Sequence, residues 1–372
     1  MKLAYVINSL EGGGAALPVP AVASVLRDEG FEVTVIALGR RDGRAEAPIR
    51  AAGFPVLVHE DAPGRHGAVL RWLDRAVARE RPAVIWTSLT RATLLGQLVG
   101  WRRGIPVVSW QHAAFLKPAN RRLLRLSRRL SRLWIGDSDT VTRLTGSRLR
   151  VPPDRLVCWP IFAADPSAPR ARPWQPDQRL ELGSLGRLHP VKGFDVLIEA
   201  LRLLRDGGWR SPVPFRLSLL GDGPAGDALR AQARASGLHE DHGGPVRFAG
   251  YSAAPRDALA ALHLYLQPSR SEGFCLAAHE AMQAALPVLA SAVGELPRSV
   301  VDGETGRLVP PGDPRALADA LAAMLSDPGR LAAMGADGRA RVLERFDAQR
   351  FRDTGGEIAR RVRAMARAGR GG

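Results

Sequence analysis

Two basic side chains, Arg187 and Lys192, lie five positions apart in residues 186–194, between a predicted strand and a predicted helix. A guanidinium and an ammonium group at the amino end of a helix could clamp a diphosphate, because the helix dipole also favours negative charge there. A solvent-exposed basic turn would contain the same two residues, since charged loop residues are usually exposed. This segment alone leaves both interpretations open.

Two carboxylates follow further along the chain, Glu272 in a predicted loop and Glu280 in the helix after it. Such a pair can bracket a ligand that lies across the start of the helix, one carboxylate accepting sugar hydroxyls and the other ribose hydroxyls. The backbone N–H groups of Phe274, Cys275 and Leu276 can face phosphate or sugar oxygens, because the first turn of a helix leaves its donors unused. Two glutamates at arbitrary spacing are usually surface residues, so the pair alone is a weak signal.

The first half of the chain contains a glycine run and a histidine at predicted strand ends. Gly13 and Gly14 follow the first predicted strand, and glycines there let the backbone approach a phosphate closely. His112 follows another predicted strand, where the alternative to a catalytic histidine is a hydrogen-bonded structural one.

Short apolar runs that alternate with amphipathic helical stretches must position these residues. The runs lie at residues 3–7, 32–37, 56–58, 84–87 and 107–110, and again at 180–185, 215–220, 246–249, 264–267 and 288–290. This alternation is typical of parallel sheets with helices on their faces. It predicts an α/β protein with two Rossmann-like domains.

Four prolines between residues 163 and 178 divide the chain. Proline fixes φ and lacks a backbone donor, so this segment reads as a linker. We therefore predict an N-terminal domain over residues 1–165, a linker over 166–178, a C-terminal domain over 179–345 and a final helix over 346–372.

The composition excludes several classes of protein. With 372 residues and 45% hydrophobic side chains the chain can bury a sizeable core. Its two cysteines, Cys158 and Cys275, indicate neither a disulfide framework nor a structural zinc site. No signal-peptide core and no long apolar span occurs, so a cytoplasmic location is expected. The net charge of +16 does not by itself indicate which kind of partner the protein binds.

Five segments of the second half resemble, in order, the motifs of glycosyltransferases of family four, which have the GT-B fold. They are residues 186–193, 221–224, 248–250, 271–282 and 302–309. The resemblance implies that Arg187 and Lys192 bind the diphosphate of a nucleotide-sugar donor, that Glu272 contacts the transferred sugar, and that Glu280 holds the ribose. In similar enzymes a histidine at the place of His112 faces the donor sugar, and the last helix packs back on the N-terminal domain.

The candidate residues form two overlapping sets. The candidate catalytic residues are Glu272, His112, Arg187 and Lys192. The candidate nucleotide-sugar-binding residues are Gly13, Gly14, Arg187, Lys192, Gly221, Gly223, Glu272, Gly273, Phe274, Cys275, Leu276 and Glu280. The chain departs from the family pattern at residues 15–18, where a polar pair is missing, and at residues 294–298, where a second glycine and then a glutamate are usual.

The resemblance implies retaining transfer of a sugar to an acceptor hydroxyl, in the synthesis of envelope polysaccharide, lipopolysaccharide or glycolipid. The acceptor would be a glycan or a lipid-linked molecule. No metal ion or other cofactor is expected, because the two cations and the helix N-termini can stabilise the leaving diphosphate. The protein would work in the cytoplasm or on the inner face of the membrane.

Two other functions fit single features of the chain. Residues 221–226 match the dinucleotide fingerprint, with Glu240 and Asp241 about twenty residues on, as in an NAD(P)-dependent oxidoreductase. The two departures from the family pattern would fit a catalytically degenerate binding protein. Residues 137–139 resemble a metal-binding D-x-D motif, but capping of a helix by Ser138 or Asp139 is the favoured interpretation.

Residues 117–133 carry seven basic side chains and no acidic one. On a helix Leu123, Leu126, Leu130 and Leu133 share one face, with arginines opposite. These leucines could form a core-facing stripe, or the segment could attach to an anionic membrane surface. Nucleic acid is not an expected partner, because the segment lacks interleaved aromatic residues.

Overall fold

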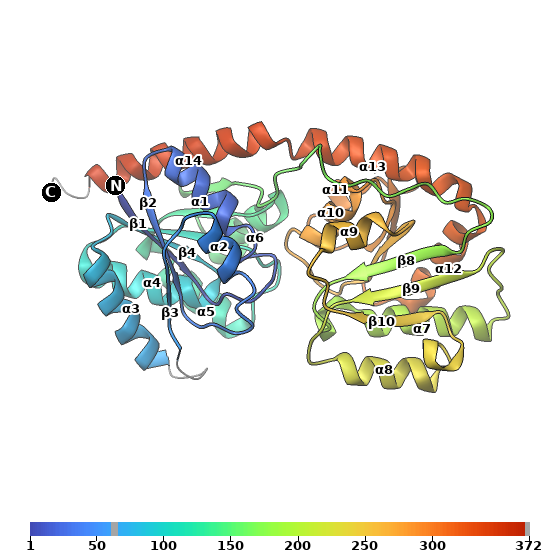
Figure 1. The fold of residues 1–372 in the computed structure, drawn as a ribbon. Helices are drawn as coiled ribbons and strands as arrows, with labels where there is room; N and C mark the ends of the chain where they lie inside the picture. Colours follow the sequence, from blue (N-terminus) through green and yellow to red (C-terminus); the bar gives the residue numbers. More distant parts are fainter. Residues whose placement is uncertain (61–65, 369–372) are drawn as a thin grey trace. The chain divides into compact units, whose positions relative to one another are not determined.

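The chain divides into two compact units (Figure 1). The computed structural model describes residues 1–60 and 66–368, so the end of the predicted helix over 346–372 lies outside it. The first unit contains residues 1–163 and the chain from residue 348 onward, and the second contains residues 164–347. Residues 166–178 contain neither helix nor strand and are part of the second unit.

A parallel sheet forms the centre of the first unit, as the alternating pattern predicted. Its seven strands run in the order β3-β2-β1-β4-β5-β6-β7. They are β1 (Lys2–Ile7), β2 (Glu32–Ala37), β3 (Val56–Val58), β4 (Val84–Ser88), β5 (Val107–Gln111), β6 (Ser131–Gly136) and β7 (Leu156–Cys158). The helices are α1 (Val19–Asp28), α2 (Glu46–Ala51), α3 (His66–Glu80), α4 (Thr90–Arg103), α5 (Pro118–Ser127), α6 (Asp139–Leu149) and α14 (Ala348–Ala368), with 3₁₀ turns η1 (Arg128–Leu130) and η2 (Pro153–Arg155).

The second unit has a six-stranded parallel sheet in the order β10-β9-β8-β11-β12-β13. Its strands are β8 (Leu180–Leu185), β9 (Phe215–Leu220), β10 (Val246–Gly250), β11 (Leu264–Gln267), β12 (Val288–Ser291) and β13 (Gly306–Val309). The helices are α7 (Phe194–Asp206), α8 (Gly226–Ala235), α9 (Pro255–Ala260), α10 (Leu276–Gln283), α11 (Leu296–Ser299), α12 (Pro314–Ser326) and α13 (Leu331–Arg345), with 3₁₀ turns η3 (Pro190–Lys192), η4 (Glu240–His242) and η5 (Pro328–Arg330). The two-sheet α/β prediction is confirmed.

The expected helical stripe over residues 117–133 is wrong in two respects. The helix α5 ends at Ser127, and Leu133 lies in the buried strand β6. Within α5 the buried leucine is Leu124, whereas Leu123 and Leu126 are exposed. The prediction that Leu123 and Leu126 face the core is therefore wrong, because within α5 Leu124 is the leucine that packs into the core.

Stacked tryptophans form the centre of the first core. Trp159 is fully buried, and its ring stacks on Trp110 with 4.9 Å between centroids. Phe351 of α14 lies 5.2 Å from the Trp159 ring, and its carbonyl accepts a hydrogen bond of 3.0 Å from the indole N–H. Gly355 leaves space for this ring, since a Cβ there would lie 2.2 Å from it. The helix α14 is thus part of the first core.

Replacement of Phe351 by alanine should destabilise the first unit by about 3 to 5 kcal/mol, because it leaves a cavity beside Trp159. Urea unfolding followed by the fluorescence of the buried tryptophans measures this loss. The control is Arg352→Ala on the exposed side of the same helix, which should change stability by less than about 0.5 kcal/mol. Equal effects of the two substitutions would contradict the packing of α14 on this core.

Candidate functional site

Each sheet has a switch point at which the order of its strands reverses. It lies between β1 and β4 in the first sheet and between β8 and β11 in the second. In open parallel sheets, ligands bind beyond the carboxyl ends of the strands at this point, because the loops diverge there. In the second unit the loops after β8 and β11, residues 186–193 and 268–275, carry the predicted cations and Glu272.

These two loops are fastened to each other. Both guanidinium nitrogens of Arg270 lie 2.6 Å from carboxylate oxygens of Asp195 at the start of α7. The backbone N–H of Arg270 donates to the carbonyl of Val191 at 2.8 Å. Gly193 adopts a left-handed conformation with φ +68°, and a Cβ there would lie 2.0 Å from the carbonyl of Pro268. Only glycine permits this close approach of the loops.

The Glu272 carboxylate collects three hydrogen bonds on one oxygen, Oε1. Its donors are Lys192 Nζ at 2.7 Å, Ser269 Oγ at 2.6 Å and Gln267 Nε2 at 3.2 Å. The Tyr265 hydroxyl donates to Gln267 Oε1 at 2.8 Å and so orients the amide. This network extends from the end of β11 into the loop and holds Glu272 beside Lys192.

The environment keeps Lys192 charged. Burial alone would lower the pKa of Lys192, but the charge of Glu272 and its hydrogen bond raise that pKa above its ordinary value. Arg187 is exposed, and its like charge acts against protonation of Lys192. An anion placed between these two cations would therefore be attracted by both.

The glycines after β9 support the loop that carries Arg187. A Cβ on Gly221 would lie 2.0 Å from the carbonyl oxygen of Gly186, and one on Gly223 would lie 2.5 Å from that of Leu188. Leu188 donates its N–H to the carbonyl of Asp222 at 2.8 Å. Residues 221–226, which match the dinucleotide fingerprint, follow β9. The switch point lies between β8 and β11, so the fingerprint is one strand away from the place where it binds a dinucleotide in Rossmann domains.

The helix α10 begins at Leu276, four residues after Glu272. Cys275 precedes the helix with φ +71°, and burial followed by the Glu272 charge raises the pKa of its thiol. The Phe274 ring is buried against His279, with 4.1 Å between ring centroids, so only the backbone of Phe274 can face a ligand. On the same helix, burial raises the pKa of Glu280 to about 7, against the opposing charge of Arg256.

The loop between β12 and α11, where the chain departs from the family pattern, braces the Glu272 loop. Gly294 has φ +60°, and a Cβ there would lie 2.4 Å from the carbonyl oxygen of Gly273 and 2.7 Å from that of Glu272. The N–H of Glu295 donates to Gly273 at 3.0 Å, and its buried carboxylate contacts Arg345. Gly294 and Glu295 are not among the site residues that the sequence predicts. A glycine and a glutamate in the loop after the buried strand β12 are the signal that could have found them.

His112 is held firmly at the carboxyl end of β5 in the first unit. Its Nε2 lies 2.8 Å from Ser88 Oγ, its Nδ1 lies 3.3 Å from Asp137 Oδ2, and its side chain is 5% exposed. The adjacent Ser138 caps α6 by accepting the N–H of Val141 at 3.1 Å, which confirms the predicted capping role of the D-x-D segment.

The glycine run lies in the turn that leads from β1 to α1. The N–H of Gly12 donates to Asp42 Oδ1 at 2.9 Å, and the carbonyl of Gly13 accepts from Ala16 at 3.1 Å. A Cβ on Gly13 would meet no atom within 4 Å, and Gly14 continues the same turn. The predicted site residues thus fall into two groups, with Gly13, Gly14 and His112 in the first unit and the others in the second.

Two classes of feature are absent from the residues that the structure describes. They contain no group of three or more His, Cys, Asp or Glu side chains placed to hold a metal ion. Nor is any helix among them both long and apolar enough to cross a membrane.

Known proteins match both halves of the chain. The family model of Glycosyltransferase Family 4 matches residues 12–162, and that of Glycosyl transferases group 1 matches residues 179–327. The D-inositol 3-phosphate glycosyltransferase of Kineococcus radiotolerans is 31% identical, over 88% of this chain and 85% of the relative. Its namesake from Thermobispora bispora is 30% identical, over 90% and 87%.

Solved structures share the fold at lower identity. Anabaena HepE in complex with UDP-glucose matches with a TM-score of 0.79 and 22% identity, over 96% of this chain and 99% of HepE. Sucrose-phosphate synthase of Thermosynechococcus elongatus matches with a TM-score of 0.76 and 20% identity, over 98% and 100%.

Two parallel sheets, each with a switch point, together with the solved structures show the GT-B fold, and the relatives at 30 to 31% identity show a glycosyltransferase. The chain belongs to the group 1 glycosyltransferases of family four, as its motifs indicated. The nucleotide fingerprint after β9 therefore does not make it an oxidoreductase.

Replacement of Gly294 by alanine should destabilise the second unit more than replacement of Gly303 does. Both residues have positive φ, but a Cβ on Gly303 would meet no atom within 4 Å, so this control carries only the backbone strain. The clash with the Glu272 loop should add about 1 to 3 kcal/mol at Gly294. Urea unfolding of the two variants measures the difference, and equal losses would show that the two loops do not approach so closely.

Proposed function

We propose that this glycosyltransferase moves a sugar from a nucleotide-sugar donor to an acceptor hydroxyl with retention of anomeric configuration. The observation that carries the proposal is the meeting of Arg187, Lys192 and Glu272 at the switch point of the second sheet. A diphosphate seated there gains two cations and the N-terminus of α7, and Glu272 is held within reach of the attached sugar.

Charge stabilisation is the main task of these residues in the proposed reaction. The bond between the anomeric carbon and the diphosphate oxygen breaks, and negative charge grows on the leaving nucleoside diphosphate. Arg187 and Lys192 stabilise that charge in the transition state more than in the ground state, which lowers the barrier. In this mechanism no metal ion or other cofactor takes part, and we expect turnover to persist in the presence of EDTA.

The acceptor attacks on the face from which the diphosphate departs. Its hydroxyl oxygen forms the new bond to the anomeric carbon, and its proton passes to a phosphate oxygen of the leaving group. Glu272 would bind hydroxyls of the transferred sugar, and the backbone N–H groups of residues 273–276 would face its oxygens or the phosphate. His112, with Gly13 and Gly14, would contact the donor from the first unit.

The acceptor we propose is a glycan or a lipid-linked molecule in cytoplasmic steps of envelope polysaccharide, lipopolysaccharide or glycolipid synthesis. A second candidate acceptor is a cyclitol phosphate, because the relatives at 30 to 31% identity are named D-inositol 3-phosphate glycosyltransferases. A panel of both acceptor types with one nucleotide sugar separates the two. The coupling constant of the anomeric proton in the product, measured by NMR, tests retention, and an inverted product would overturn it.

Binding of a nucleoside diphosphate is the first property to measure. A ligand that binds only the folded protein raises its melting temperature by mass action. Thermal shifts with UDP, GDP, ADP, CMP and NAD should single out one nucleoside diphosphate. A shift with NAD alone would overturn the proposal, and no shift at all would favour a degenerate protein.

Replacement of Arg187 or Lys192 by alanine should lower turnover by about 10² or more, because each cation stabilises the leaving diphosphate. Initial rates with saturating donor measure the effect. Lys2→Ala, an exposed lysine of the first unit, is the control and should keep the full rate. Arg187 is exposed, so its variant should fold, and an unchanged rate for it would remove Arg187 from the proposed mechanism.

Nucleotide affinity should depend on pH through Glu280, whose pKa is about 7. An ionised carboxylate accepts ribose hydroxyls better than a neutral one, so affinity for UDP-glucose should fall about tenfold from pH 8 to pH 6. Calorimetric titration of UDP-glucose measures this change, because its diphosphate is esterified at both ends and does not itself titrate in this range. Glu280→Gln should remove it, and a slope that survives in this variant would place the ribose elsewhere.

The same raised pKa has the opposite consequence for folding. The folded protein holds the Glu280 proton more tightly than the unfolded chain does, because burial disfavours the charged form. This group should therefore lower stability as the pH rises from its ordinary pKa of 4.5 through 7, which urea unfolding at several pH values would detect.

A further inference from the structure

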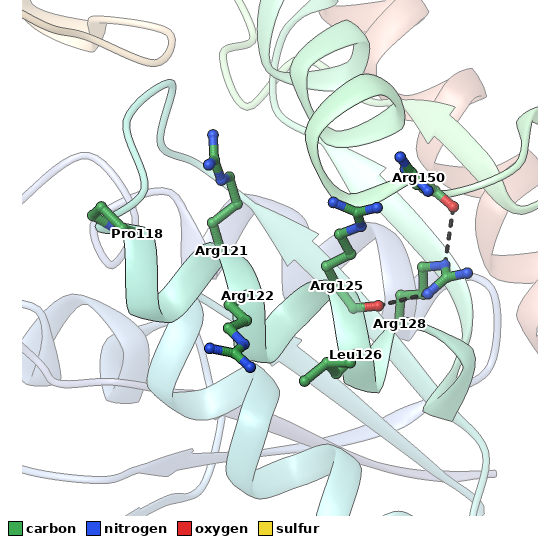
Figure 2. A pocket seen from close by; sticks show the side chains of 7 residues that line it. All are labelled: Pro118, Arg121, Arg122, Arg125, Leu126, Arg128 and Arg150. Atoms are coloured by element: carbon green, nitrogen blue, oxygen red, sulfur yellow. Dashed lines mark hydrogen bonds between the residues drawn. The ribbon is translucent and has the colours of Figure 1, made fainter.

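Arginines line an open hollow beside α5 in the first unit (Figure 2). Its volume is about 610 Å³, and a second hollow of about 230 Å³ shares Arg128 and Arg150 with it. The residues that line the first are Pro118, Arg121, Arg122, Arg125, Leu126, Arg128 and Arg150. We call these residues, together with Phe115, Leu123, Arg129 and Leu130, the α5 surface.

The positive charge of this surface is not balanced by carboxylates in the lining. Of the described residues that line either hollow, none is Asp or Glu. Arg128 donates to two backbone carbonyls, that of Arg125 at 2.7 Å and that of Arg150 at 3.1 Å (Figure 2). These bonds fix the guanidinium without neutralising it, so the hollow keeps a positive potential.

Large apolar side chains are exposed on α5 and in the segment that leads into it. Leu126 is 71% exposed, Phe115 is 63% exposed and Leu123 is 50% exposed. Leu124 is buried and fixes which side of α5 faces inward, so Leu126 and Leu123 lie on the outward side with Arg122. Exposed apolar residues that gather on one surface mark an interaction site more often than single ones do.

We propose that the α5 surface docks the protein on a bilayer that contains anionic lipids. The arginines contact lipid phosphates, and Leu123, Leu126 and Phe115 enter the boundary between headgroups and acyl chains. A nucleic acid would satisfy the arginines but leave the leucines in water, because only Phe115 offers a ring for a base to stack on. The mixture of charge and exposed leucine therefore favours a lipid surface.

Sedimentation with lipid vesicles tests this docking with the full chain. The protein should sediment with vesicles of phosphatidylcholine and phosphatidylglycerol at low salt and stay in solution with phosphatidylcholine alone. Raising the salt should weaken binding without abolishing it, since salt screens the charges but not the apolar contact. No sedimentation with anionic vesicles at low salt would overturn the proposal.

The charge variant is Arg121→Glu with Arg125→Glu, one turn apart on α5. It should lower the vesicle partition coefficient at least about tenfold, because each arginine contributes to attraction by anionic lipid. Arg71→Glu with Arg75→Glu is the matched control, since these exposed arginines stand one turn apart on α3 of the same unit. The control changes the net charge equally and should keep most of the binding. Equal losses in the two variants would overturn a specific α5 surface.

The apolar variant is Leu123→Ser with Leu126→Ser, and its control is the exposed Leu98→Ser on α4. The double variant should lower vesicle binding about tenfold or more, and the residual binding should become fully salt-sensitive. Unchanged binding would mean that the arginines attract any polyanion, which would overturn the bilayer assignment. Transfer to a water-soluble acceptor should persist in both α5 variants, so failure of docking and failure of the proposed transferase activity are distinguishable.

Discussion

The partly buried ion pair between Lys192 and Glu272 is the contact on which the candidate site of the second unit depends. A partly buried charge that loses its partner costs several kcal/mol, so each of these residues requires the other to stay in place. Their loops can approach closely enough only because Gly193 lies against the carbonyl of Pro268 and Gly294 lies against the Glu272 loop. Three loops from three strands are thus arranged around one salt bridge of 2.7 Å.

The two units carry different candidate site residues at the carboxyl ends of their parallel strands. In both, parallel strands end at one edge and the strand order reverses near the middle of the sheet, which opens a place for a ligand. The second unit places an ion pair there. The first places His112 one strand beyond its switch point, after β5, where Ser88 at the end of β4 and Asp137 hold the two ring nitrogens. A rigid histidine and a rigid lysine both suit chemistry that depends on preorganised groups.

Local pattern predicted much of this fold. All ten predicted strands occur, because buried parallel strands are short apolar runs that stand out between helices. Strand β6 was not predicted, because the helical spacing of leucines and arginines in the sequence continues through Arg132. In the structure the helix α5 ends at Ser127 and β6 begins at Ser131. A glycine and a glutamate after a buried strand draw attention to residues 294–295, but the contact of Gly294 with a loop about twenty residues away in sequence follows only from tertiary packing. The side of α5 that faces inward could not be predicted either, because tertiary packing determines that Leu124 is buried.

The return of α14 to the first unit has a consequence for the order of events during synthesis. The indole of Trp159 receives its partner, the carbonyl of Phe351, only after the whole of residues 164–347 has been made. The amino-terminal unit is therefore the first to leave the ribosome and the last to be completed, while the second unit can close on its own in the interval. Until then the stacked tryptophans lack the helix that covers them, which makes this the period in which a nascent chain most needs protection from aggregation.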